Sequence, residues 1–115
     1  FINLDGIGAK GKIFINYGKS LIPYFSTSKS MIYKKLKKAS NRCGTRLHLS
    51  PFNLAYMTDH YPFSLKGFDS LTISSFGPKS IYIHSKNDIP ENINISSLYE
   101  TGKLLIEFIK VMNEK

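Results

Sequence analysis

Near the start of the chain, three glycines lie between two runs that both favour strands, and this arrangement limits the fold. FINLD at residues 1–5 and KIFINY at residues 12–17 are rich in β-branched and aromatic residues, which favours strands. A dinucleotide-binding loop needs its glycines between a strand and a helix, and an acidic residue about 20 positions later. Here a strand pattern comes after the glycines, and no acidic residue occurs between Asp5 and Asp59. The segment is therefore interpreted as a glycine-rich turn in a hairpin-like pair of strands.

Helical periodicity is clear in two later segments. From Ser28 to Arg42 the apolar residues recur at i, i+4, i+7 and i+11, which predicts one helix face formed by Ile32, Leu36, Ala39 and Cys43. Ser97 and Glu100 match a capping box, and a helix to about residue 113 is expected after them, with an apolar face at Leu98, Leu105, Ile109 and Met112. Thr58 or Asp59 is placed to cap a short helix with Pro62 in its first turn.

Extended patterns occupy most of the remaining chain. Residues 46–49 and 69–76 read as strands, and residues 80–83 read as a shorter extended segment. Strands that alternate with helices predict a layered α/β arrangement with a mixed sheet.

Composition and charge limit the classes of partner and metal site. The 115 residues suffice for one domain, and the net charge of +8 favours an anionic partner. The outer face of the first helix carries the densest basic group, Lys34, Lys35, Lys37 and Lys38, but no RNA-binding aromatic motif accompanies it. Nucleic acid is therefore not expected as a partner. Because Cys43 is the only cysteine, any metal site must use Asp, Glu or His.

The first residues of the chain lead to two expectations. Phe1 is not a start methionine and FINL reads as the inside of a buried strand, so we expect the sequence to be part of a longer protein. A strand edge exposed at residue 1 would invite pairing with another copy, which predicts a homodimer. No apolar stretch approaches the roughly 20 residues that a bilayer requires, and localisation stays open.

Asp5 comes directly after an apolar strand. Such a residue faces the carboxyl end of the sheet, where α/β enzymes place their ligands. On spacing alone, a turn or capping role is favoured over a ligand role.

Three separated stretches occur together in a characteristic order: NLDGIG at 3–8, TDHYPFSLKG at 58–67 and IHSKND at 83–88. They resemble the C-terminal half of the co-catalytic di-zinc aminopeptidases of metallopeptidase family twenty-eight. In that family an N-L-D-x-I-G strand end supplies a metal-binding Asp, an S-D-H-x-P-F loop lines the site, and a late H-T-x-x-D loop supplies a metal-binding His. The resemblance covers nearly the whole chain. It implies that residues 1–115 are the C-terminal part of one α/β/α zinc-exopeptidase-like domain, without the N-terminal part.

The resemblance also implies roles for individual residues. Asp5 would bind one zinc ion through a carboxylate oxygen, and His84 would bind a second zinc ion through an imidazole nitrogen. Asp59 matches a family loop that contributes no metal ligand, so it is expected to be a helix cap or a substrate-contacting wall of the pocket. Tyr82 lies one position earlier than the family tyrosine and is a second candidate for substrate contact. Asp88 is expected to fix the His84 loop by accepting a backbone N–H.

The implied function is aminopeptidase activity, in which water activated by two zinc ions hydrolyses the N-terminal bond of a peptide substrate. The family's other ligands and its general-base Glu lie upstream of the N-L-D strand, and no residue of this chain matches them. We therefore expect no catalytic residue within these 115 residues and no peptidase activity from them alone. Two alternatives are a non-catalytic relative of the fold and a small basic module that binds an anionic partner.

Overall fold

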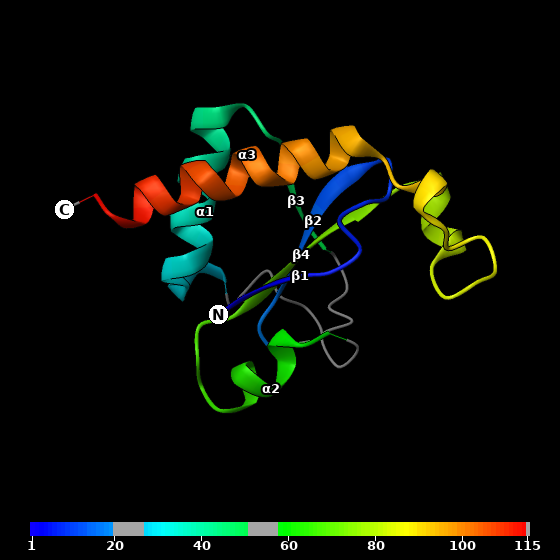
Figure 1. Cartoon of the computed structure of the whole chain (residues 1–115). Coiled ribbons are helices and arrows are strands. Elements are labelled where there is room, and N and C mark those ends of the chain that lie inside the picture. The colour runs from blue at the N-terminus through cyan, green and yellow to red at the C-terminus, as the bar shows by residue number, and fades with distance from the viewer. Residues whose placement is uncertain (20–26, 51–57, 115) are drawn as a thin grey trace.

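A computed structural model describes residues 1–19, 27–50 and 58–114 (Figure 1). Four strands form one mixed sheet in the order β1-β4-β2-β3, with bounds β1 Ile2–Leu4, β2 Lys12–Tyr17, β3 Leu47–Leu49 and β4 Leu71–Phe76. β4 runs parallel to β1 and antiparallel to β2, and β2 runs parallel to β3. The helices are α1 Met31–Cys43, α2 His60–Leu65 and α3 Ile95–Met112. The predicted α/β class with a mixed sheet is confirmed.

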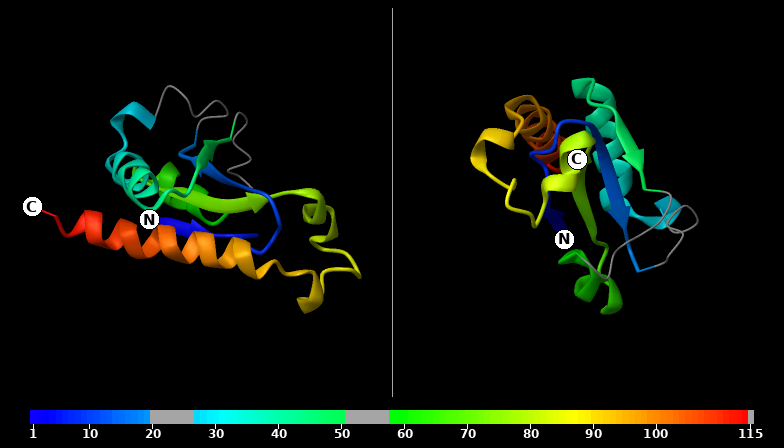
Figure 2. Two further views of the ribbon diagram at one scale, coloured as in Figure 1. Left: turned by 90° about the horizontal axis from the view of Figure 1, so that it is seen from above. Right: turned by 90° about the vertical axis from the view of Figure 1, so that its right-hand side faces the viewer.

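One face of the sheet carries the core, beneath α1 and α3 (Figure 2). Alternate residues of β2 and β4 point to this face, as the period of a strand requires. The buried cluster consists of Ile13, Ile15, Leu71 and Ile73 from the sheet, Leu36 and Ala39 from α1, and Leu104, Phe108 and Val111 from α3. The predicted apolar face of the first helix is thereby confirmed, with Ile32 and Cys43 at its partly buried margin. Among the described residues, no helix has the length and apolar character needed to cross a bilayer.

The predicted start of the last helix is wrong, and its predicted apolar residues are only partly buried. Asn94 is the N-cap, because its side chain accepts the N–H of Ser97, so Ser97 lies inside the first turn. Glu100 instead accepts a hydrogen bond from Thr45 at 2.8 Å. The buried face includes Thr101, Leu104, Phe108 and Val111. Of the predicted apolar residues, Leu105 packs against the core, whereas Ile109 and Met112 are exposed. Asparagine caps helices as well as serine does, and α3 is apolar on more than one face, so spacing could not identify the buried one.

The first two strands do not form a hairpin, because β4 lies between β1 and β2. The connection at residues 5–11 crosses the end of β4 so closely that backbone meets backbone. A Cβ atom on Gly11 would overlap the carbonyl group of Phe76, and one on Gly77 would overlap that of Lys10. The glycines are needed for this close approach, a role that the turn interpretation did not include.

The segment at 80–83 is not extended. A 3-10 helix, η4, covers Pro78–Tyr82. Pro78 fixes a backbone angle suited to the first helical turn. The Ser80 hydroxyl accepts the N–H of Gly77 at 3.0 Å and closes that turn.

Asp69 joins the start of β4 to the start of α1. Its carboxylate accepts the N–H of Ile32 at 2.9 Å, the hydroxyl of Ser30 at 2.7 Å and the hydroxyl of Tyr17 at 3.0 Å. Partial burial opposes ionisation, but these hydrogen bonds outweigh it and hold the pKa of Asp69 below its usual value. The carboxylate thus satisfies donors at a helix N-terminus from a distant strand.

The crossing at Gly11 predicts a severe effect of a single methyl group. We expect Gly11→Ala to lower the free energy of unfolding by at least about 3 kcal/mol, because the new Cβ displaces the Phe76 backbone. The matched control is Gly102→Ala within α3, where a Cβ meets nothing within 4 Å. That change should raise the free energy of unfolding by about 0.5–1 kcal/mol, since alanine favours helix. Urea unfolding measures both changes in free energy. Equal effects of Gly11→Ala and Gly102→Ala would contradict the close backbone approach at Gly11.

Candidate metal and substrate site

Asp5 lies where β1 ends beside β4. Since these strands are parallel neighbours, their carboxyl ends meet at the same end of the sheet. The Asp5 N–H donates to the Ile73 carbonyl at 3.1 Å. The next residue, Gly6, turns the chain with φ 62°, and its carbonyl accepts the N–H and the hydroxyl of Ser75 at 3.3 and 2.9 Å. The backbone on both sides of the Asp5 side chain is therefore fixed to β4.

His84 lies in the loop after β4 and η4. Its φ is 62°, and among the described residues it is the one non-glycine with positive φ. Its N–H donates to the Asp88 carboxylate at 3.2 Å, which confirms the predicted role of Asp88. Ser85 binds back to the Tyr82 carbonyl through both its N–H and its hydroxyl, at 2.9 and 2.6 Å. These bonds hold His84 in a backbone conformation that residues with a side chain rarely adopt.

The turn after Asp5 and the loop before His84 contact each other. A Cβ on Gly6 would lie 3.7 Å from the Cδ1 atom of Ile83, which is an ordinary van der Waals distance. Both segments line a hollow of about 220 Å³, to which Tyr82 and Asp88 also contribute. Much of its wall is apolar, but Lys79 and Asn92 also line it; the apolar part comes from Ala9, Ile89, Ile93 and Leu98. The structure thus brings together the segments that carry Asp5, Tyr82 and His84.

The side chains of Asp5 and His84 are exposed, and neither forms a hydrogen bond or ion pair with a described residue. A carboxylate oxygen and an imidazole nitrogen are both donors that zinc accepts. Within residues 1–19, 27–50 and 58–114, however, no group of three or more His, Cys, Asp or Glu residues is placed to hold one ion. The donor types fit zinc, and the described residues alone leave its coordination shell incomplete.

Asp59 lies elsewhere. It occupies the N-cap position of α2, but its side chain makes no capping hydrogen bond. α2 packs at the start of β4, where Ser70 donates to the His60 carbonyl at 3.1 Å, whereas Asp5 and His84 come after the ends of β1 and β4. The structure does not bring Asp59 to the other two residues, and its contact with substrate stays a prediction.

His60 is fully buried and joins three segments. Its Nε2 atom lies 3.0 Å from the Gly18 carbonyl, and its Nδ1 atom lies 2.7 Å from the Thr72 hydroxyl and 2.9 Å from that of Thr58. The carbonyl requires a proton on Nε2, which assigns Nδ1 as the acceptor. Burial lowers the pKa of His60, although the bond to Gly18 opposes this. His60 is a structural link, and no local signal in the sequence distinguishes it from a catalytic histidine.

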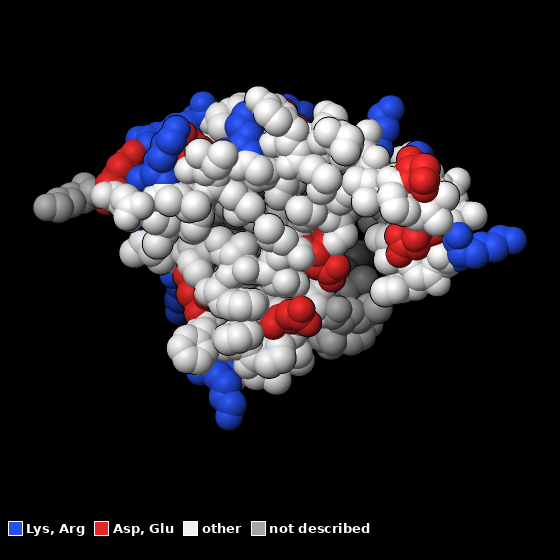
Figure 3. All heavy atoms as spheres, viewed as in Figure 1, with Lys and Arg blue, Asp and Glu red and all other residues white. Residues whose placement is uncertain are grey.

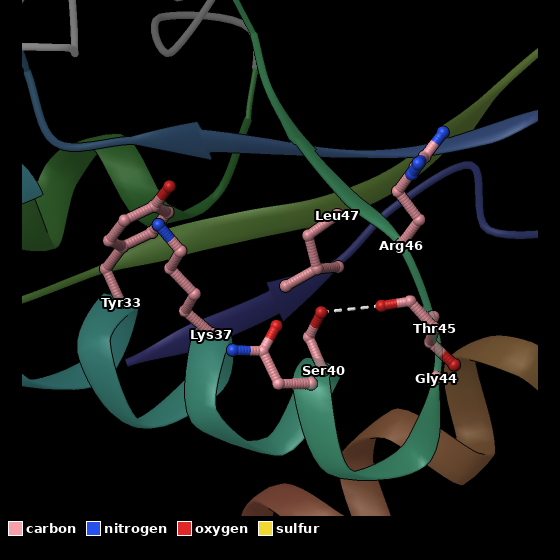
Figure 4. Close-up of a pocket in the computed structure, with 8 residues that line it drawn as sticks. Tyr33, Lys37, Ser40, Gly44, Thr45, Arg46 and Leu47 are labelled. Carbon is pink, nitrogen blue, oxygen red and sulfur yellow. Dashed lines mark hydrogen bonds between the residues drawn. The ribbon is translucent and has the colours of Figure 1, made fainter.

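A second hollow, of about 380 Å³, lies at the opposite edge of the sheet between α1 and β3 (Figure 4). Tyr33 and Lys37 stand on one side of it and Arg46 on the other, with Leu47 between them. Several neighbouring cations are engaged by the end of α3, since Lys35 donates to the Val111 carbonyl at 2.9 Å. Lys38 and Arg42 both pair with Glu114. This pairing leaves the predicted basic surface with fewer free charges than the sequence suggests.

Comparison with known proteins identifies a family. The model described as Peptidase family M28 matches residues 1–109. No curated protein and no solved structure matches the chain.

The left-handed conformation of His84 predicts that this residue costs stability. We expect His84→Gly to leave the free energy of unfolding unchanged or to raise it by up to about 1 kcal/mol, because glycine adopts positive φ without strain. The control Lys86→Gly, in the same loop but without positive φ, should lower it by about 0.5–1 kcal/mol. Thermal and urea unfolding measure the stability of both variants. A clear loss of stability in His84→Gly would show that the side chain has a structural role.

Burial of neutral His60 predicts a pH dependence of stability. Since the folded state lowers its pKa, the unfolded chain binds more protons, and the free energy of unfolding falls as the pH drops below about 6.5. The slope reaches at most about 1.4 kcal/mol per pH unit for one group. Urea unfolding between pH 5 and 7.5 should show this slope in the wild type and in His48→Gln, and lose it in His60→Gln. A slope retained in His60→Gln would assign it to another group.

Proposed function

Since this chain belongs to peptidase family M28, we propose that it forms the C-terminal part of the active site of a zinc-dependent aminopeptidase. In this proposal Asp5 binds one zinc ion and His84 binds the other. The observation that carries it is the contact between the two loops at the ends of the parallel strands β1 and β4, through Gly6 and Ile83. Two unpaired donor side chains on touching loops suit a shared centre better than two separate surface roles.

The chain's own contribution is to orient two ligands. The Asp5 backbone is fixed to β4 on both sides, and the His84 backbone is fixed by Asp88, while both side chains stay free to bind. Zinc, when bound, would polarise the scissile carbonyl and lower the pKa of a bound water. Tyr82 and the apolar wall beside it would contact the substrate, since they line the same hollow as Gly6 and Ile83, the chain neighbours of the two ligands.

In this proposal the remaining ligands come from a part of the natural protein outside this sequence. A catalytic zinc ion takes about three protein ligands, and the described residues bring no three such groups together. The general base is also expected in the preceding part of a longer protein, where the family carries its Glu pair. The 115 residues alone would then orient part of a site without completing it.

This proposal predicts the effect of each ligand on activity in the natural protein that carries this sequence. We expect Asp5→Ala and His84→Ala each to lower kcat/KM for a leucine anilide by at least about 100-fold, since loss of supporting residues alone typically costs 10–100-fold. Both variants should also bind less zinc, measured by metal analysis after dialysis. The matched controls are Glu91→Ala and His48→Ala, which remove the same chemical groups elsewhere and should retain activity.

Two results would contradict the proposal. One is full activity and zinc content in Asp5→Ala or His84→Ala. The other is turnover by the 115-residue chain with added zinc that His84→Ala abolishes, since this would mean that the site is complete within the chain. Inactivity of the natural protein with intact zinc ligands would favour a non-catalytic relative of the fold.

A further inference from the structure

The hollow between α1 and β3, which we call the α1–β3 hollow, lies away from the proposed zinc site. β3 is the edge strand at the opposite end of the sheet from β1, and the residues around the hollow come from α1 and from the chain that leads into β3 (Figure 4). None of the described residues that line it belongs to β1, β4 or the loops that follow them. A segment that extended the sheet beyond β1 would therefore add at the far edge from this hollow.

Two cations at the α1–β3 hollow have no acidic partner. Lys37 lines it from α1 and Arg46 lines it from the residue before β3, and both are exposed. Neither side chain forms a hydrogen bond or ion pair with a described residue. The described lining residues include no Asp or Glu, in keeping with the lack of acidic residues between Asp5 and Asp59. Two uncompensated positive charges around a recess attract an anion.

The neighbouring lysines of α1 differ from Lys37 in their partners or their position. Lys35 and Lys38 bind groups at and just after the end of α3. In Figure 3, blue and red atoms accordingly lie together at the upper left, where Figure 1 places α1 and the end of α3. Lys34 and Lys37 have no partner among the described residues, and of these two only Lys37 lines the hollow.

The α1–β3 hollow has room for more than a bare ion. Its volume of about 380 Å³ lies in the range of about 300–1,000 Å³ that is typical of small-molecule sites. Tyr33 and Leu47 contribute an aromatic ring and an aliphatic side chain to its wall, and Asn41 contributes an amide. Tyr33 lies one turn before Lys37 on the same side of α1. A ligand with a flat apolar body beside its anionic group matches this wall.

Polar contacts hold the end of α1 in place beside the hollow. Gly44 ends the helix in the left-handed conformation, with φ 72°. The Ser40 hydroxyl donates to the Thr45 carbonyl at 2.6 Å, and the Thr45 hydroxyl donates to the Glu100 carboxylate at 2.8 Å. These bonds tie the turn to α1 and to α3, so the wall of the hollow is formed before any ligand binds.

We propose that the α1–β3 hollow binds a phosphate group, either free or carried by a small molecule. Arg46 would donate to the phosphate oxygens from its planar fork, and Lys37 would add a compact positive charge. Phosphate fits better than carboxylate because a monoester carries about 1.5 to 2 negative charges at pH 7 and three acceptor oxygens, which can meet two cations from different sides. Tyr33 and Leu47 would pack against the rest of an ester ligand.

Titration calorimetry with phenyl phosphate tests this site, since the probe joins a flat ring to the phosphate. The natural protein that carries this sequence is first dialysed against a chelator, because zinc accepts oxygen donors and would itself bind the probe. We expect a Kd of about 1 mM or lower, which is modest for a ligand of this size. Lys37→Gln and Arg46→Gln should each raise the Kd at least about tenfold, as loss of a charged hydrogen bond typically does. Both residues are exposed, so the fold should persist, which circular dichroism checks.

The matched control is Lys34→Gln, which removes the same charge from α1 outside the hollow and should change the Kd less than about twofold in 0.15 M salt. Three results would overturn the proposal: no binding of phenyl phosphate up to about 10 mM, an unchanged Kd in Lys37→Gln or Arg46→Gln, or an equal loss of affinity in Lys34→Gln.

Two further probes identify the group that is recognised. Equal affinity for benzoate would overturn the choice of phosphate over carboxylate. Inorganic phosphate that binds as tightly as phenyl phosphate would support a site for free phosphate, and weaker binding of inorganic phosphate would support a site for a phosphate ester. All of these measurements are made without zinc and without a peptide substrate, so their failure is distinct from failure of the proposed peptidase function.

Discussion

The close crossing of the 5–11 connection over the end of β4 determines most of the architecture. Because Gly11 and Gly77 leave no side chain between them and the opposing backbones, the chain can leave β1, pass the end of β4 and enter β2 on its far side. β4 is thereby central and pairs with β1 on one side and β2 on the other. The parallel β1–β4 pair results from this order, and so does the meeting of the loops that carry Asp5 and His84. A hairpin would have separated those loops.

Asp5 and His84 each combine a fixed backbone with a side chain that has no partner among the described residues. Hydrogen bonds to Ile73 and Ser75 fix the turn around Asp5, and Asp88 fixes His84 at a φ of 62°. A strained conformation persists only where the surroundings over-determine it, and such residues cluster at functional sites. The observed backbone of His84 therefore favours a ligand role, in agreement with the absence of any side-chain partner for it among the described residues.

The sequence predicted what depends on local pattern and missed what depends on distant contacts. The first helix and its buried face were predicted from periodicity, and the four strands were placed to within about two residues of their observed bounds. Strand order was out of reach, because a glycine-rich turn and a backbone crossing have the same composition. The cap of α3 was misplaced by three residues, since Asn94 competes with Ser97. Asp69 and His60 act on elements up to 52 and 42 residues away, so nothing near them in the sequence marks their roles.

The incomplete ligand set and the open edge of the sheet meet at one strand. Asp5 comes directly after β1, and β1 is an edge strand with one unpaired side among the described residues. A segment that brought further ligands to Asp5 by extending the sheet would pair with the outward backbone groups of Ile2 and Leu4. The edge strand that positions the proposed ligand Asp5 is therefore also the strand to which such a segment would add.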